Sequence, residues 1–236
     1  MDILKIKLHQ EIAVYRNPVT MEIIESYPLP PPSTVLGMLH CMLGEFDSDR
    51  RVDLSIQGSY GALLRDYQHY KKFGMNRPYP IVVNILHDVR LTLHIKAEDT
   101  LLKRIEEAIL FPSYYPYLGR AEDLVKFESI DLVKVDEFDE DVETLRLPAL
   151  IPAEWSRSLN LNGVPYRLPT FCSFKTVQIG KEQREVRDFE WKDYYFVEAS
   201  ADFSREGPDV KIFVDNQGDF VWWCLPNLPQ ETLQKH

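Results

Sequence analysis

The feature that most constrains the fold is a helical pattern that begins directly after a dense run of prolines. Four of the five positions 28–32 are proline, within the stretch YPLPPPSTVLG. Proline fixes φ and removes a backbone donor, so we expect an extended chain up to the first helical turn. Apolar residues then recur at helical spacing, at Val35, Met38, Leu39, Met42, Leu43 and Phe46. The sequence predicts a helix with one buried face, Ser33 as its N-cap, and unpaired N–H groups that suit a phosphate.

Strand and helix patterns alternate over the first part of the chain. Residues 2–10 alternate apolar and polar side chains, as a half-buried strand does. The further predicted elements are a strand over 52–58, a hairpin of 81–86 and 89–96 turning at His87-Asp88, a helix over 101–109 stopped by Pro112, and a strand over 125–135. This β-α-β-β-α-β order predicts an α+β fold of the ferredoxin-like, RNA-recognition-motif type.

The second part of the chain has a different character. Residues 164–179, 187–200 and 210–225 are rich in aromatic and β-branched residues and are separated by turn signals. The sequence therefore predicts two domains: 1–143, with a thumb inserted at 59–80, and a mainly β subdomain over 144–236.

Composition excludes several classes of protein. The chain has 236 residues, 44% of them apolar, and no run approaches the roughly 18 apolar residues that span a membrane. Three cysteines far apart in the sequence favour a reducing cytoplasm, and no Cys/His spacing predicts a metal site. There is no P-loop or dinucleotide fingerprint, so we expect no cofactor.

The net charge of −10 is concentrated in one segment. Residues 122–143 carry two lysines against ten acidic residues, whereas residues 1–121 are neutral. A solvated strand and loop is the simpler interpretation, and a docking surface for a basic partner is the alternative.

Residues 59–80 interleave cations with aromatic side chains. The segment contains one acid, Asp66, and four cations, Arg65, Lys71, Lys72 and Arg77. The aromatic residues among them are Tyr60, Tyr67, Tyr70, Phe73 and Tyr79. Cations neutralise phosphates and aromatic faces stack on unpaired bases, so this mixture suits single-stranded RNA. An ordinary solvated loop is the equally weighted alternative.

The stretch PSYYPYLGR, residues 112–120, is a second candidate. Tyr114, Tyr115 and Tyr117 could pack or stack, with packing favoured. Arg120 beside Gly119 is the better phosphate candidate, because a guanidinium offers two parallel hydrogen bonds.

Catalytic signals are sparse. No G-x-S-x-G elbow surrounds Ser33, and the cysteines lack a paired histidine. One alternative is metal-free RNA cleavage, which needs a base, an acid and a cation. His69, Tyr70, Lys71 and Lys72 could supply all three.

Two motifs in order resemble the Cas-five family of CRISPR-associated proteins. Its signature before the first helix is matched by Tyr27, Pro28, Pro30, Pro31, Ser33, Thr34 and Gly37. A Tyr-Leu-Gly-Arg element after the second helix is matched by Tyr117, Leu118, Gly119 and Arg120. The resemblance is clear over about residues 1–135 and most like the type I-B branch.

The resemblance implies a non-catalytic subunit of a type I Cascade ribonucleoprotein in antiviral defence. Such a subunit, with a fold of the RAMP superfamily, binds the 5′ handle of the crRNA, caps a filament of Cas-seven-type backbone subunits and docks a Cas-eight-type large subunit. Contact with target DNA stays open. The expected RNA contacts are Arg16, Tyr27, Ser33, Thr34, Arg65, Tyr70, Lys71, Lys72, Arg77, Tyr117, Gly119 and Arg120.

Two alternatives remain beside this one. The type I-C branch cleaves precursor RNA with a tyrosine and a Lys-His pair, but the only such neighbours here are Lys235-His236 near the end of the chain. A purely structural adaptor that meets only proteins would instead rely on the acidic 122–143 segment.

Overall fold

The computed structural model describes residues 2–20, 23–44, 52–71, 74, 76–138, 142–180, 182–204 and 211–225. The helices are α1 (Pro32–Leu43), α2 (Asp99–Leu110) and α3 (Ala153–Ser158). The strands are β1 (Asp2–Ala13), β2 (Ile23–Ile24), β3 (Asp53–Tyr70), β4 (Tyr79–Lys96), β5 (Lys126–Phe138), β6 (Val142–Thr144), β7 (Ala149–Pro152), β8 (Val164–Ile179), β9 (Glu182–Val197), β10 (Asp202–Ser204), β11 (Ile212–Asp215) and β12 (Phe220–Val221).

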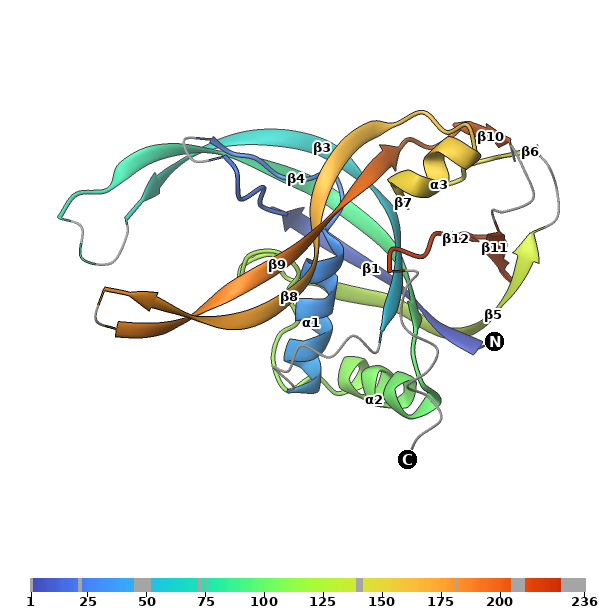
Figure 1. The fold of residues 1–236 in the computed structure, drawn as a ribbon, viewed down its shortest axis with the longest axis horizontal. Helices are drawn as coiled ribbons and strands as arrows, with labels where there is room; N and C mark the ends of the chain where they lie inside the picture. The colour runs from blue at the N-terminus through green and yellow to red at the C-terminus, as the bar shows by residue number, and fades with distance from the viewer. Residues whose placement is uncertain are drawn as a thin grey trace.

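Within these residues ten strands form one sheet that curls into a half-barrel (Figure 1). Its strand order is β12-β11-β5-β1-β4-β3-β7-β9-β8, and β2 lies beside β4. The pairs are antiparallel except for the short parallel pair of β2 and β4. The remaining strands, β6 and β10, pair with each other.

The prediction of an α+β ferredoxin-like fold is wrong, because the structure is mostly antiparallel strand. The elements from β1 to β5 do follow one another as expected, but C-terminal strands extend their sheet on both sides. Gln57 of β3 pairs with Ala149 of β7, and Val135 of β5 pairs with Asp215 of β11. A strand edge offers unpaired backbone groups that a further strand can satisfy. Strand pairs between residues so far apart in sequence have no local sequence pattern that could predict them.

The main core joins both longer helices to one face of the sheet. It includes Leu4, Ile6 and Leu8 of β1 together with buried side chains of α1 and α2. The predicted first helix is confirmed as α1, which ends at Gly44 with a left-handed φ of 68°; Phe46 lies outside the described residues. The second predicted helix is confirmed as α2.

The predicted N-cap is wrong by two residues. Pro31 is the N-cap of α1 and Pro32 is its first helical residue. Proline suits this first position because its φ is already helical and the N–H it lacks would have no partner there.

The predicted turn at His87-Asp88 is also wrong. β4 continues through both residues, and β3 and β4 form one long hairpin that extends to the pair Tyr70–Tyr79. Asp88 has a φ of 51° and is absent from the pairing with both β1 and β3. The site of the predicted turn is therefore a local irregularity in a continuous strand.

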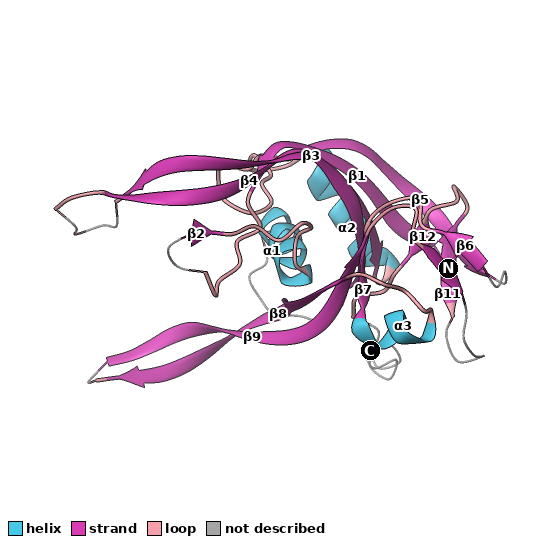
Figure 2. Ribbon diagram, turned by 90° about the horizontal axis from the view of Figure 1, so that it is seen from above, coloured by secondary structure: helices cyan, strands magenta, loops and turns pink. Residues whose placement is uncertain are grey.

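Two long hairpins project from the body in the same direction (Figures 1 and 2). The first arm is the outer part of the β3–β4 hairpin, residues 62–87, and includes most of the predicted thumb. The second arm is the β8–β9 hairpin, residues 164–197. Seen from above, α1 and β2 lie between the two arms (Figure 2). Among the helices of the described residues, none is long and apolar enough to cross a membrane.

Candidate nucleic-acid interface

The first arm sorts its side chains onto two faces. Its strands pair in unbroken register from Ala62–His87 to Tyr70–Tyr79, so successive residues point to opposite sides. Arg65, Tyr67 and His69 therefore share one face, and the rings of Tyr67 and His69 contact at 6.2 Å. All three side chains are exposed, and Tyr67 is 66% accessible. This basic-aromatic face is therefore open to direct contact with a ligand.

The cations of this arm are available for an anion. Arg65, Lys71 and Arg77 are exposed, and the structure gives them no ion-pair partner among the described residues. Lys72 lies outside the described residues. Asp66, the acid of the segment, points to the face opposite Arg65, where its carboxylate accepts a hydrogen bond from Gln68 at 2.8 Å. A phosphate at Arg65 would therefore gain a charge-assisted hydrogen bond without displacing an existing partner.

The alternative catalytic set is not gathered at one point. Strand alternation places His69 on one face of the arm and Tyr70 on the other, where the Tyr70 ring packs edge-on against Tyr79 at 5.4 Å. A base and an acid that act on one scissile bond must both reach it. In this conformation of the arm, the His69 and Tyr70 side chains point to opposite faces.

Tyr27 is buried at the root of the arms. Its ring is 4% exposed and meets Tyr166 edge-on at 5.8 Å. Its hydroxyl lies 3.2 Å from Asn17 Oδ1 and 3.5 Å from the carbonyl of Arg167. Burial, followed by the neighbouring Tyr166, raises the pKa of Tyr27. The residue therefore joins the proline run to the second arm, and little of its surface is open to RNA.

Ser33 and Thr34 are half-buried in the first turn of α1, and no other described residue forms a hydrogen bond with either hydroxyl. The Thr34 N–H donates to the carbonyl of Pro31 at 2.9 Å, which leaves the Ser33 N–H as the free donor of this turn. Arg16 is exposed, and its backbone forms an isolated bridge with Ser26.

The Tyr-Leu-Gly-Arg element forms a tight loop fastened to β1. Gln10 Nε2 donates to the carbonyls of Leu118 and Asp123, each at 2.9 Å. Gly119 has a φ of 111°, and a Cβ at this position would lie 2.9 Å from both Asp123 Oδ2 and the carbonyl oxygen of Val14. Only glycine fits this backbone conformation and this space.

Arg120 is held by the fully buried carboxylate of Asp123. Its Nη2 lies 2.8 Å from Asp123 Oδ1, and its Nη1 lies 3.2 Å from Glu122 Oε1. Asp123 Oδ2 also accepts the backbone N–H groups of Val14 and Arg120. Burial opposes the charge on Arg120, but the hydrogen bonds to Asp123 outweigh it and raise the arginine pKa. The Arg120 side chain is 23% exposed, and its guanidinium therefore serves mainly to hold the loop in place.

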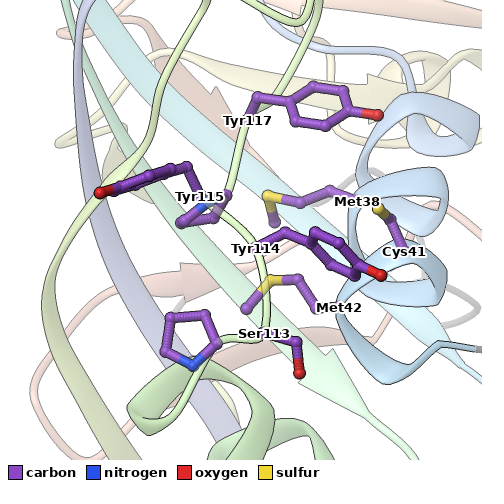
Figure 3. Close-up of a pocket in the computed structure, with 9 residues that line it drawn as sticks. Met38, Cys41, Met42, Ser113, Tyr114, Tyr115 and Tyr117 are labelled. Atoms are coloured by element: carbon purple, nitrogen blue, oxygen red, sulfur yellow. The ribbon is translucent and has the colours of Figure 1, made fainter.

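The tyrosines before this loop are exposed, so the packing interpretation is wrong for two of them. Tyr114 and Tyr115 are 73% and 86% accessible, and Tyr117 is 39% accessible. Figure 3 shows Tyr114 and Tyr117 directed toward α1 and Tyr115 directed away from it. A small pocket lies between this loop and the Met38, Cys41 and Met42 side chains of α1 (Figure 3).

Cations from other elements neutralise much of the acidic segment. Arg120 pairs with Glu122 and Asp123, and Lys211 lies 2.9 Å from Glu137. Arg90 lies 3.6 Å from Glu128. Over residues 122–138 the segment therefore presents far less net negative charge than its sequence indicates.

A buried charged cluster that no sequence pattern predicts lies under the β11–β12 hairpin. Lys5 Nζ lies 2.5 Å from Asp215 and 2.7 Å from Asp219, and His94 Nε2 lies 3.0 Å from Asp215. Burial lowers the pKa of His94, against the opposing hydrogen bond to Asp215. Burial would raise the pKa of Asp215, but hydrogen bonds from His94 and Lys5 hold it far below its usual value. Alternation in β1 and β4 could have identified Lys5 and His94 as neighbours on one sheet face, but not their distant partner.

No group of three or more His, Cys, Asp or Glu side chains suited to a metal ion occurs in the part of the chain that the structure describes.

The fold is similar to that of one chain of known structure from an RNA-guided complex. A chain of a CRISPR RNA-guided surveillance complex superimposes with a TM-score of 0.54 at 13% identity, covering 88% of this chain and 94% of that one. A CRISPR protein from Archaeoglobus fulgidus gives a TM-score of 0.48 at 15% identity, covering 94% of this chain and 98% of the other. No curated protein matches the sequence significantly.

The family itself is shown by sequence. A family model described as CRISPR-associated protein (Cas_Cas5) matches residues 3–187. The chain belongs to the Cas5 family.

Proposed function

We propose that this Cas5-family chain is a non-catalytic subunit of a CRISPR RNA-guided complex that holds the 5′ handle of the crRNA. The observation that carries the proposal is the exposed face of Arg65, Tyr67 and His69 on the first arm. An unpaired guanidinium binds phosphate, and an exposed ring is a platform for an unpaired base. Lys71, Lys72 and Arg77 would add cations to this contact, and Tyr70 would offer a ring on the opposite face of the arm.

The root of the molecule would supply the rest of the interface. Ser33 and Thr34 offer two hydroxyls beside the Ser33 N–H, and Arg16 adds an exposed cation. Tyr27, Gly119 and Arg120 would act mainly by fixing the shape of this root, since each is buried or engaged within the protein.

The partners follow from the same proposal. The subunit would cap a filament of Cas-seven-type subunits and dock a Cas-eight-type large subunit, in a system of type I-B. Such a system uses a separate nuclease to process the crRNA, so this chain would bind repeat RNA without cutting it. Incubation of the purified chain with repeat RNA and a chelator is expected to leave the RNA intact. Specific cleavage under these conditions would contradict the proposal.

Purification of the tagged chain from its host tests the assembly directly. We expect crRNA and the other subunits to copurify with the wild-type chain. The double variant Arg65→Glu, Tyr67→Ala should retain the fold and lose most of the crRNA. The variant Arg184→Glu provides a control, because it reverses an exposed arginine on the second arm. Equal crRNA recovery from all three chains would contradict the proposal.

A further inference from the structure

The second arm also sorts its side chains onto two faces. Strands β8 and β9 pair in unbroken register from Phe171–Glu190 to Ile179–Glu182, and residues directly opposite one another share a face. Phe174 therefore lies beside Arg187, and Thr176 lies beside Glu185. Phe189 and Trp191 follow Arg187 on the same side of β9. These six residues define the ring face of the second arm.

The two faces of this arm differ in how their cations are satisfied. On the opposite face Lys175 Nζ lies 2.8 Å from Asp188 Oδ1, and Arg184 Nη2 lies 2.7 Å from Glu182 Oε2. Arg187 is exposed, and the structure gives it no ion-pair partner among the described residues. The ring face thus presents a cation that is available to an anionic ligand.

Aromatic rings flank this cation. The Phe174 side chain is 50% exposed and that of Phe189 is 37% exposed. The Phe189 ring lies 6.4 Å from the ring of Trp191, so the apolar surface continues toward the root of the arm. Exposed rings on the surface of a sheet are a common platform for unpaired RNA bases, and a neighbouring cation tracks the phosphates.

The acids of the same face do not cancel this cation. Toward the root, Asp193 lies directly opposite Arg167, so these two charges offset each other. Toward the tip, Glu185 and Thr176 are both exposed. A carboxylate accepts a hydrogen bond from a ribose 2′-hydroxyl, and a threonine hydroxyl can donate to it or accept from it. DNA lacks this hydroxyl, so the polar part of the face favours RNA.

We propose that the ring face binds a second stretch of unpaired RNA, separate from the stretch on the first arm. Arg187 meets a phosphate, and Phe174 and Phe189 each stack on a base. The two arms project in the same direction (Figure 2), which favours one RNA strand as the ligand of both. The proposal rests on the proposed function only for the source of this RNA, which is the strand held by the first arm.

The test isolates the ring face by disabling the first arm. Fluorescence anisotropy measures the Kd of labelled oligouridine, about 12 nucleotides long, for the full chain that carries Arg65→Glu and Tyr67→Ala. Adding Phe174→Ser and Phe189→Ser should raise this Kd at least fivefold, the lower limit for loss of one stacked base. The control adds Val177→Ser and Val186→Ser, which remove apolar side chains from the opposite face, and should change Kd less than twofold.

Two further readouts follow the phosphate and the ribose. In the same background, Arg187→Gln should reduce the slope of log Kd against log salt by about 0.7, as expected for one phosphate of a single strand. Arg184→Gln on the opposite face should leave this slope unchanged. Oligouridine should bind about 2- to 10-fold more tightly than oligodeoxyuridine, as expected for one hydrogen bond to a 2′-hydroxyl. Glu185→Ala should narrow that difference.

Three results would overturn the proposal. They are no binding of oligouridine when the first arm is disabled, equal Kd values for the phenylalanine and valine variants, and DNA binding as tight as RNA binding. A protein occupant would appear as a copurified subunit that falls at least tenfold with Phe174→Ser and Phe189→Ser while oligouridine binding is unchanged. If handle RNA still depends on Arg65, any of these results removes the second site and leaves the proposed function standing.

Discussion

The root loop, Tyr117–Asp123, and the first arm place similar residues in opposite circumstances. Arg120 in the root loop is bound by a buried carboxylate, whereas Arg65 on the arm has no ion-pair partner among the described residues. Tyr27 beside the root is packed against Tyr166, whereas Tyr67 on the arm is open to solvent. Two of the residues that carry the family resemblance, Tyr27 and Arg120, are thus engaged inside the protein.

This contrast separates two ways in which a residue can matter to RNA binding. A buried or ion-paired motif residue at the root, such as Tyr27 or Arg120, acts by holding the scaffold, so its loss should appear as lower stability. A residue on the exposed face of the first arm acts by contact, so its loss should appear as lower affinity in a protein of normal stability. Mutations on the two sides can break or sharpen this distinction.

The largest effect is expected at Asp123. The variant Asp123→Ala leaves Arg120 and two backbone N–H groups without their acceptor in a buried position. Breaking a buried ion pair from one side costs about 3–5 kcal/mol of unfolding free energy. Urea unfolding followed by circular dichroism measures this, with the exposed Glu122→Ala as control. A loss no larger than that of the control would show that the loop does not depend on the carboxylate.

The second-largest loss of stability is expected at Gly119. The variant Gly119→Ala places a Cβ against Asp123 and Val14 at a positive φ, which costs on the order of 1–3 kcal/mol. Gly37→Ala is the matched control, because its Cβ meets no atom within 4 Å and alanine favours a helix. Thermal unfolding should therefore move in opposite directions for the two substitutions. A stable Gly119→Ala protein would contradict the assigned loop geometry.

On the arm, Tyr67→Ala is expected to weaken handle RNA binding without altering stability. Loss of one stacked base corresponds to about 1–3 kcal/mol, or roughly a 5- to 150-fold rise in Kd. Leu64→Ala removes an apolar side chain of similar exposure from the opposite face of the same strand. Fluorescence anisotropy with labelled handle RNA distinguishes them. Equal Kd values for both variants would remove the distinction between the faces.

The smallest expected effect concerns pH and involves neither region. The folded-state pKa of His94 lies below its ordinary value of about 6.5, so the unfolded chain binds this proton first as pH falls. The wild-type protein should lose stability relative to His94→Gln below about pH 6.5. Asp53, whose pKa burial raises to about 6, contributes the opposite slope in both proteins and cancels in the difference. A difference in unfolding free energy that stays flat from pH 8 to 5 would contradict the shift.

Sequence patterns predicted the helices better than the sheet, for a physical reason. The apolar face of α1 is recorded locally in residues such as Val35 and Leu39, which are buried as the spacing predicted. The first arm has no clean period because both of its faces carry exposed residues, so no alternation is required of it. Its extent as a strand was therefore missed.

Long-range partners were equally invisible in the sequence. Asp123 belongs to the segment that is predicted to be a solvated strand and loop, although its side chain is fully buried beside Arg120. Lys5 and Asp215 lie at opposite ends of the chain yet share a buried ion pair. The exposure of the Tyr114 and Tyr115 rings depends on the path of the loop after α2. The spacing of apolar residues does not encode that path.

The most direct test of the account compares two charge reversals in one titration. Arg65→Glu and Arg184→Glu change the same charge on exposed arginines of the first and second arms. Both isolated proteins are titrated with labelled handle RNA at the same salt concentration, after circular dichroism has confirmed equal folding. We expect at least a tenfold rise in Kd for Arg65→Glu and less than a twofold rise for Arg184→Glu. Kd values within twofold of wild type for both variants would contradict the assignment of RNA contact to the first arm.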